Sequence, residues 1–167
     1  MPFKKPHQTA DQGSIVKKID GSFEIKPKGL NIIWGNDLRY WKTITNDGAE
    51  LIQVSWLEVS GKVGPVKVGE TYVVNFDIAV KDTGFGWGNT EVLIMAKIGK
   101  KGSYKYKPVK LACGDNGYIP KPDEEQLEIT VTVNDKDLDL HFGLYEVWSG
   151  KWKGGLIIKK AEVTKKS

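Results

Sequence analysis

Several short stretches of the chain alternate apolar with polar residues, and this alternation limits the fold more than any other feature. In residues 71–80, every second residue from Tyr72 to Val80 is large and apolar. A similar alternation recurs in residues 127–133 and 138–144. A period of two places successive side chains on opposite faces of a β-strand, so each stretch predicts a strand with one buried face.

Further strands are expected where short apolar runs lie between turn signals, in residues 29–34, 51–59, 91–98, 103–111 and 155–163. Residues 91–98 are apolar on both faces, which predicts a central, covered strand. Trp56 shares a strand face with apolar neighbours and is expected in the core. A short helix is expected near residues 37–42. The pattern predicts an all-β protein, a β-sandwich or jelly roll of about eight or more antiparallel strands.

The length of 167 residues fits one domain with its own core. Residues 1–22 are polar and lack a firm pattern, so we expect a loose, flexible N-terminal arm before a single domain at residues 23–167. Cys113 is the only cysteine, which excludes an intrachain disulfide. No apolar run is long enough for a secretory signal or a membrane span, so we expect a cytoplasmic or nucleocytoplasmic protein.

The net charge of +4 comes from 25 basic and 21 acidic residues, and Arg39 is the only arginine. Nucleic-acid readers use the arginine fork for bases and phosphates, so this balance favours a solvated lysine surface. Six lysines lie between residues 97 and 110. An RNA- or protein-binding role for this lysine-rich face is the alternative that the sequence leaves open.

Five of the six tryptophans lie in three aromatic clusters at predicted strand ends. The clusters are residues 34–41, 84–89 and 148–155, and each combines tryptophan with glycine and polar residues. Loops at the ends of a sandwich carry binding residues, although a loop tryptophan can equally plug the end of the core.

These clusters contain the groups that a β-linked pyranose requires. A flat indole covers the apolar C–H face of the sugar, and amide, carboxylate and amine groups bind its hydroxyls. An N-acetyl group adds a methyl for an aromatic slot and an amide for hydrogen bonds. The same side chains stack on RNA bases, so composition alone leaves both ligands open.

Three blocks of sequence resemble the plant phloem protein 2 lectins, the Nictaba-like family. AELIQVSWLEVSGKV, at residues 49–63, resembles the family's AEL-x-x-V-x-WL-x-x-x-GK segment. IIWGNDLRYW, at residues 32–41, resembles its I-x-W-x-x-(N/D)-x-x-YW segment. KWKGGLIIKKAEV, at residues 151–163, resembles its W-K-x-G-(L/I)-I-V-K-G-x-(D/E)-I ending. The blocks come in the family's order and span residues 30–163.

The resemblance implies a jelly-roll sandwich, usually a homodimer, in the nucleocytoplasm or phloem sap. It implies binding of N-acetylglucosamine oligomers (chitin fragments and N-glycan cores) and of glycoproteins, without catalysis or cofactor. Two family tryptophans associated with sugar binding match Trp34 and Trp41. A distant relative of the fold, in glycoprotein-specific F-box proteins, uses an aromatic-Trp-Lys loop that matches Lys151, Trp152 and Lys153, where Lys151 replaces the aromatic.

The predicted carbohydrate-binding residues are Trp34, Asn36, Asp37, Tyr40, Trp41, Lys151, Trp152 and Lys153. Trp87 and Trp148 are weaker candidates. The chain departs from the family at residues 124–126, where relatives often carry an Asp-Gly-Trp sequence. The lysine run that serves some members as a nuclear signal is only diffuse here.

Catalytic and metal sites are not expected. His141 shares a strand face with Asp137 and Asp139, a row that fits acid–base or metal chemistry but is more typical of the wet face of an antiparallel strand. The GFGWG sequence at residues 84–88 is followed by a predicted strand, whereas a dinucleotide-binding loop precedes a helix. No local pair of carboxylates indicates a glycosidase, which needs two of them ~5–10 Å apart.

Binding strength favours a lectin that uses several contacts at once. One sugar of about fifteen non-hydrogen atoms at ~0.3 kcal/mol per atom gives ~4–5 kcal/mol, a dissociation constant near the millimolar range. Useful affinity then requires an extended site, or two sites in a dimer with an avidity gain of ~10²–10⁴.

Overall fold

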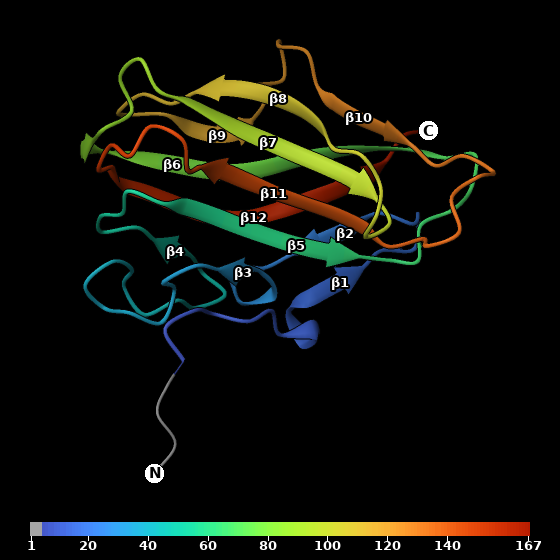
Figure 1. The fold of residues 1–167 in the computed structure, drawn as a ribbon, viewed down its shortest axis with the longest axis horizontal. Coiled ribbons are helices and arrows are strands. Elements are labelled where there is room, and N and C mark those ends of the chain that lie inside the picture. Colours follow the sequence, from blue (N-terminus) through green and yellow to red (C-terminus); the bar gives the residue numbers. More distant parts are fainter. Residues whose placement is uncertain (1–4) are drawn as a thin grey trace.

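A computed structural model describes residues 5–167 and shows two antiparallel sheets packed face to face (Figure 1). The strands are β1 (Ile15–Lys17), β2 (Phe23–Ile25), β3 (Asn31–Ile32), β4 (Ala49–Glu50), β5 (Leu57–Val63), β6 (Thr71–Phe85), β7 (Glu91–Ile98), β8 (Lys105–Lys110), β9 (Asn116–Ile119), β10 (Leu127–Thr130), β11 (Leu140–Glu146) and β12 (Gly154–Lys165). Two 3₁₀ turns, η1 (Gln12–Ser14) and η2 (Pro27–Gly29), flank the first strands. In residues 5–167, no helix is long and apolar enough to cross a membrane.

The strand order is that of a jelly roll. One sheet runs β1-β2-β12-β6-β10, with β4 beside β12 and β9 beside β6, and the other runs β3-β5-β11-β7-β8. Most neighbours within a sheet are distant in sequence, because the chain repeatedly crosses from one sheet to the other. The prediction of an all-β jelly-roll sandwich is confirmed.

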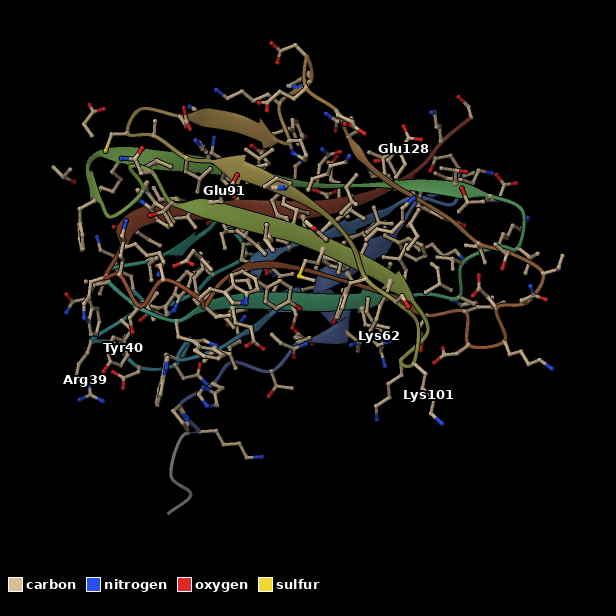
Figure 2. The ribbon with its side chains drawn as sticks, turned by 45° about the horizontal axis from the view of Figure 1, so that its top comes forward. Arg39, Tyr40, Lys62, Glu91, Lys101 and Glu128 are labelled. Atoms are coloured by element: carbon tan, nitrogen blue, oxygen red, sulfur yellow. The ribbon has the colours of Figure 1, made fainter. Side chains whose placement is uncertain are left out.

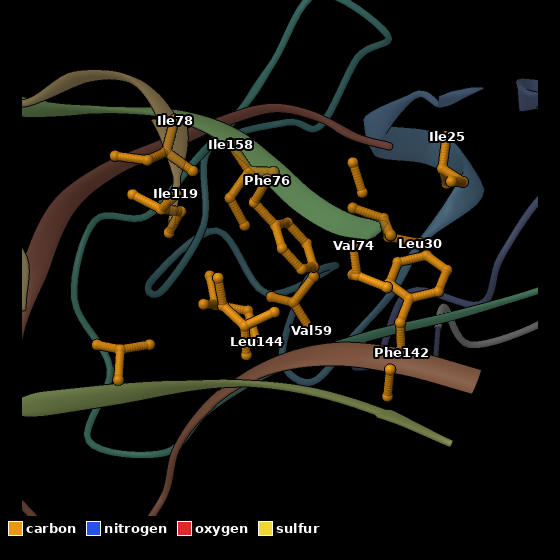
Figure 3. Close-up of a cluster of buried hydrophobic side chains, with 14 of the residues drawn as sticks. Ile25, Leu30, Val59, Val74, Phe76, Ile78, Ile119, Phe142, Leu144 and Ile158 are labelled. Atoms are coloured by element: carbon orange, nitrogen blue, oxygen red, sulfur yellow. The ribbon is translucent and has the colours of Figure 1, made fainter. Parts of the chain in front are cut away.

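Alternation in the sequence becomes alternation of burial in the strands. In β6 the side chains at Tyr72, Val74 and Phe76 point into the space between the sheets, and those between them are partly exposed. Phe76 meets Phe142 of β11 across this space, with ring centroids 6.0 Å apart (Figure 3). The core is thus built from the inward faces that the period of two predicted.

Part of the predicted loose arm lies against the domain. The backbones of Gln8 and Ile32 exchange hydrogen bonds of 2.9 and 3.0 Å, which extends the edge of the sheet at β3. β1 pairs with β2, and Ser14 is buried. Backbone pairing therefore holds residues 8–17 in place, while Ile19 is fully exposed and residues 1–4 lie outside the described residues.

Residues 51–59 are not one strand, which corrects the prediction for Trp56. The chain leaves the seven-stranded sheet after β4 and enters β5 only at Leu57. Trp56 lies in the crossing segment with 46% of its surface exposed, and its indole N–H donates to the Glu58 carboxylate at 3.0 Å. Residues 37–40 form a turn that contains no assigned helix.

Gly61 of β5 faces Phe142 across the strand pair, and both point inward. A β-carbon at Gly61 would collide with the Phe142 ring, which is itself buried to 1% exposure. The missing side chain of the glycine therefore makes room for the phenylalanine.

We expect Gly61→Ala to lower the free energy of unfolding by about 1–3 kcal/mol, because the packed core cannot move the phenylalanine ring aside. Urea denaturation measures the change. Gly88→Ala is the matched control, since a β-carbon there meets open space. Equal stability of the two variants would contradict this account of the core.

Candidate functional site

The loops that carry the three aromatic clusters meet at one end of the sandwich. β6 ends there and β12 begins there, since Gly154 pairs with Phe85. Figure 2 shows Arg39 and Tyr40 at this end, whereas Lys101 lies at the opposite end. The aromatic clusters therefore lie at the end of the sandwich opposite the loop that carries Lys101, which belongs to the lysine-rich segment at residues 97–110.

Four rings form a continuous aromatic row at this end: His7, Trp34, Tyr40 and Trp152. The His7 ring meets Trp34 edge-on at 4.9 Å, and Trp34 lies 5.7 Å from Tyr40. Tyr40 stacks on Trp152 with centroids 6.4 Å apart and an interplanar angle of 27°. Trp152 is 52% exposed. The row thus joins residues of the first and third sequence clusters into one surface.

Trp34 adopts a left-handed backbone conformation, with φ of 64°, which is rare for a bulky residue. Its backbone N–H donates to Nδ1 of His7 at 2.8 Å. The Asn36 amide, predicted to bind sugar, donates instead to the backbone carbonyls of Lys5 and His7 at 2.9 and 3.1 Å. These contacts hold the strained turn and aim the Trp34 ring along the row.

Asp37 and Arg39 form a charged pair beside the row. The guanidinium donates to both carboxylate oxygens, at 2.7 and 3.0 Å, and lies 5.1 Å from the Tyr40 ring. Hydrogen bonds from Arg39 lower the pKa of Asp37, so this carboxylate is ionised at neutral pH. Arg39 was missing from the predicted site, although it lies within the first cluster.

A buried ion pair supports the loop that carries Trp152. Nζ of Lys153 lies 3.0 Å from the Glu146 carboxylate, and the side chains are 0% and 3% exposed. The ammonium also donates to the carbonyls of Ser55 and Lys151, at 2.7 and 2.8 Å. Lys153 was predicted to hydrogen-bond sugar, but these three acceptors occupy its ammonium inside the protein.

Glu146 in turn organises the residues that follow β11. Its carboxylate accepts the Ser149 hydroxyl at 2.6 Å and the backbone N–H groups of Trp148 and Ser149 at 3.3 Å. Burial by itself would raise the pKa of Glu146, but the Ser149 hydroxyl and the Lys153 ammonium outweigh it and lower the pKa. Glu146 was not predicted, because a charged residue ending an apolar strand normally faces solvent.

Trp41 and Trp87 lie inside the protein, which corrects their predicted place at the binding surface. Trp41 is 1% exposed, and its N–H has no hydrogen-bond partner among residues 5–167. Trp87 is 2% exposed and donates its N–H to the carbonyl of Gly154 at 2.9 Å. Both plug the end of the sandwich, so neither presents a ring face to a ligand.

Glycines allow the second and third clusters to pack backbone against backbone. A β-carbon at Gly86 would lie 2.7 Å from the Cα of Lys153, and its φ of +87° favours glycine. A β-carbon at Gly155, where φ is +82°, would lie 2.6 Å from the Cα of Gly84. The glycine-rich sequence at residues 84–88 is therefore a support for the Trp152 loop.

The remaining candidates have exposed side chains. Lys151 and Trp148 are exposed on the loop between β11 and β12, and Trp148 has 60% of its surface accessible. Both lie on the same loop as Trp152, and Lys151 directly precedes Trp152 in the chain.

His141 lies on the outward face of β11, between Lys62 and Lys97 in the strand register. Burial, followed by the positive charge of Lys97, lowers the pKa of His141. This position matches the predicted wet face of the strand. In the described part of the chain, no group of three His, Cys, Asp or Glu side chains is placed to hold a metal ion.

Comparison with known proteins shows relatives in plants. The family model described as phloem protein 2 matches residues 21–165. The Arabidopsis thaliana protein PHLOEM PROTEIN 2-LIKE A9 is 37% identical, over 96% of this chain and 96% of its own length. PHLOEM PROTEIN 2-LIKE A1 from the same plant is 26% identical, over 86% of this chain but only 61% of its own length.

Among solved structures, a family 16 carbohydrate-binding module has a TM-score of 0.44 and 13% sequence identity, over 85% of this chain and 86% of that chain. The GH26-CBM35 β-(1,4)-mannanase from Podospora anserina has a TM-score of 0.47 and 9% identity, over 89% of this chain and 28% of that chain.

We expect Glu146→Gln to lower the free energy of unfolding by about 3–5 kcal/mol, because it leaves the Lys153 ammonium buried without a counterion. Denaturant titration at pH 7 measures the loss. Glu125→Gln breaks an exposed pair with Lys107 and is the matched control, with little change expected. A loss no larger than that of the control would contradict the role of the buried pair.

The same pair predicts a pH dependence. Since folding lowers the pKa of Glu146, its contribution to stability is complete above the unfolded pKa of about 4.3 and is lost as pH falls through the folded pKa. The stability difference between wild type and Glu146→Gln should therefore narrow below about pH 4.3. A difference that stays constant from pH 7 to pH 3 would show that Glu146 does not titrate in this way.

Proposed function

The chain belongs to the phloem protein 2 family, and we propose that it is a non-catalytic lectin that binds N-acetylglucosamine oligomers at the aromatic row. The observation that carries the proposal is the stacked contact between Tyr40 and Trp152. It joins two sequence blocks that are more than one hundred residues apart into one surface at the loop end of the sandwich.

The aromatic row offers a series of stacking faces along one direction. Trp152 is half exposed, and Trp34 and Tyr40 are partly exposed beside it. Pyranose rings with equatorial hydroxyls present flat C–H faces that fit such rings. A chain of linked sugars therefore matches the row better than a single sugar.

Polar groups next to the row would fix the orientation of the sugars. The ionised Asp37 accepts hydrogen bonds, while the exposed guanidinium of Arg39 and ammonium of Lys151 donate them. The Asn36 amide nitrogen is already used within the protein, so its contribution to binding is indirect. Compared with the sequence prediction, the proposed site loses Trp41, Trp87 and Lys153 and gains His7 and Arg39.

A single sugar is expected to bind with a dissociation constant near the millimolar range. This weak affinity supports the further proposal that the protein acts as a homodimer, since two linked sites raise the apparent affinity by avidity. We place it in the cytoplasm or phloem sap, on the strength of the family alone. Sedimentation across a concentration series tests the oligomeric state.

Calorimetry with chitotriose tests the proposed function. We expect saturable binding by the wild type and at least a tenfold weaker affinity for Trp152→Ala, which removes the half-exposed indole of the row. Tyr118→Ala is the matched control, since Tyr118 is an exposed aromatic of β9 that is not part of the aromatic row. Trp41→Phe should bind as the wild type does per folded molecule, because Trp41 is buried.

No saturable heat with chitotriose would contradict the proposal. Ionic strength separates it from the alternative of nucleic-acid binding by the lysine-rich face. Sugar binding by stacking should change little between 50 and 200 mM salt, whereas RNA binding falls steeply over this range. Release of shortened oligomers on incubation would instead indicate a glycosidase.

A further inference from the structure

The outer face of the five-stranded sheet carries aromatic side chains that the aromatic row does not use. This face, formed by β5, β11, β7 and β8, lies toward the viewer in Figure 1. Tyr104 and Tyr106 are 42% and 58% exposed, and Trp56, in the crossing segment just before β5, is 46% exposed. These rings lie on a sheet surface, whereas plugging rings would be buried as Trp41 and Trp87 are.

Tyr145 lies near the end of β11, the central strand of this face. It points outward from β11, and a β-carbon placed on Gly143 would lie 2.6 Å from three atoms of the tyrosine side chain. The ring therefore covers Gly143 and runs along the sheet, and Tyr145 remains partly exposed. Gly143 lies within a strand and has no positive φ, so backbone conformation does not require glycine at this position. The glycine instead leaves space for the Tyr145 ring.

Neighbouring side chains extend this ring into a band across the strands. Glu58 is paired with Tyr145 in the register of β5 and β11, and it accepts the indole N–H of Trp56. On the other side, Tyr104 lies next to the Tyr145 hydroxyl, and Nζ of Lys97 lies 4.6 Å from the Tyr104 ring centroid. The band crosses β5, β11, β7 and the start of β8, three interstrand spacings or about 14 Å.

Apolar side chains of β7 fill the space beneath and beside the band. Leu93 and Met95 point outward and are partly buried, although no further layer formed by residues 5–167 covers them. In the register, Tyr145 pairs with Leu93, and Met95 pairs with Tyr106 of β8. The result is a flat apolar surface with hydroxyl and carboxylate groups along it.

The face carries charges of both signs. Glu58 accepts the indole N–H of Trp56, Lys97 donates to the carbonyl of Lys100 at 2.7 Å, and Lys62 lies 3.9 Å from Asp139. A face of mixed sign gives little net attraction for a nucleic acid or an acidic glycan. Flat rings flanked by polar groups instead suit a neutral sugar chain, which has apolar faces and a rim of hydroxyls.

We propose that this face is a second carbohydrate-binding surface, centred on Tyr145, that takes a neutral β-linked oligosaccharide across the strands. The ligand class rests on the proposed lectin function, but the site is separate from the aromatic row. The proposal assigns a binding role to Gly143, Tyr145 and Tyr106, which the sequence patterns did not single out.

NMR titration of ¹⁵N-labelled Trp152→Ala with chitohexaose, and separately with cellohexaose, tests the proposal without the aromatic row. We expect saturable shifts at the amides of Gly143, Tyr145 and Met95 with at least one sugar. Tyr145→Ala in the same background should weaken this binding at least tenfold. Tyr118→Ala, on the other sheet, should leave it unchanged.

Two further variants keep the test decisive if Tyr145→Ala does not fold. Gly143→Ala should displace the tyrosine ring, and Tyr106→Ala should remove an exposed ring of the band, each with weaker binding. The absence of saturable shifts on this face with both sugars would overturn the proposal. A change of oligomeric state in these variants without sugar binding would overturn it too, and would assign the face to a second copy of the chain.

Different experimental results would contradict the two proposed sites. If the aromatic row is not a sugar site, wild type and Trp152→Ala bind chitohexaose alike, and the shifts on the sheet face remain. If the sheet face is not a site, Tyr145→Ala binds as its parent does, whatever happens at the aromatic row.

Discussion

The buried contact between Lys153 and Glu146 is the interaction on which the loop end of the sandwich depends. It ties the end of β11 to the start of β12, and through the Ser55 carbonyl it also holds the segment that leads into β5. A charge removed from water is tolerated only where its partners are in place. The pair therefore anchors the loop beside Trp152, whose ring stacks on Tyr40.

Around this pair, tryptophans with similar sequence neighbours differ in role: two are buried and close the core, and two are accessible. Trp41 and Trp87 close the end of the core, and the glycines at residues 84–88 let the closing loops approach each other. Trp34 and Trp152 stand on this closed base and remain accessible. A rigid base matters for sugar recognition, since weak stacking contacts add up only when the rings are already in position.

Much of the fold could be predicted from local pattern, whereas the site could be predicted only in part. Within β6, Val74 and Phe76 had to share a face, because a strand fixes side-chain direction with a period of two. The predicted burial of Trp56 was wrong because residues 51–56 cross from one sheet to the other. In such a crossing segment, side chains no longer alternate between a buried and an exposed face. Lys153 was misplaced because its partner, Glu146, lies on another strand and gives no signal in the sequence around the lysine.

The sequence by itself determined the long strands of the core, their inward faces and the family, since these follow from periodicity and from ordered motifs. Only the tertiary structure decided which aromatic rings are exposed and which of them touch. In a loop, the direction of a side chain depends on what packs against it, and the packing partners of Trp41 and Trp152 come from distant segments. That is why the row of Trp34, Tyr40 and Trp152, and the ring of Tyr145 over Gly143, became visible only in three dimensions.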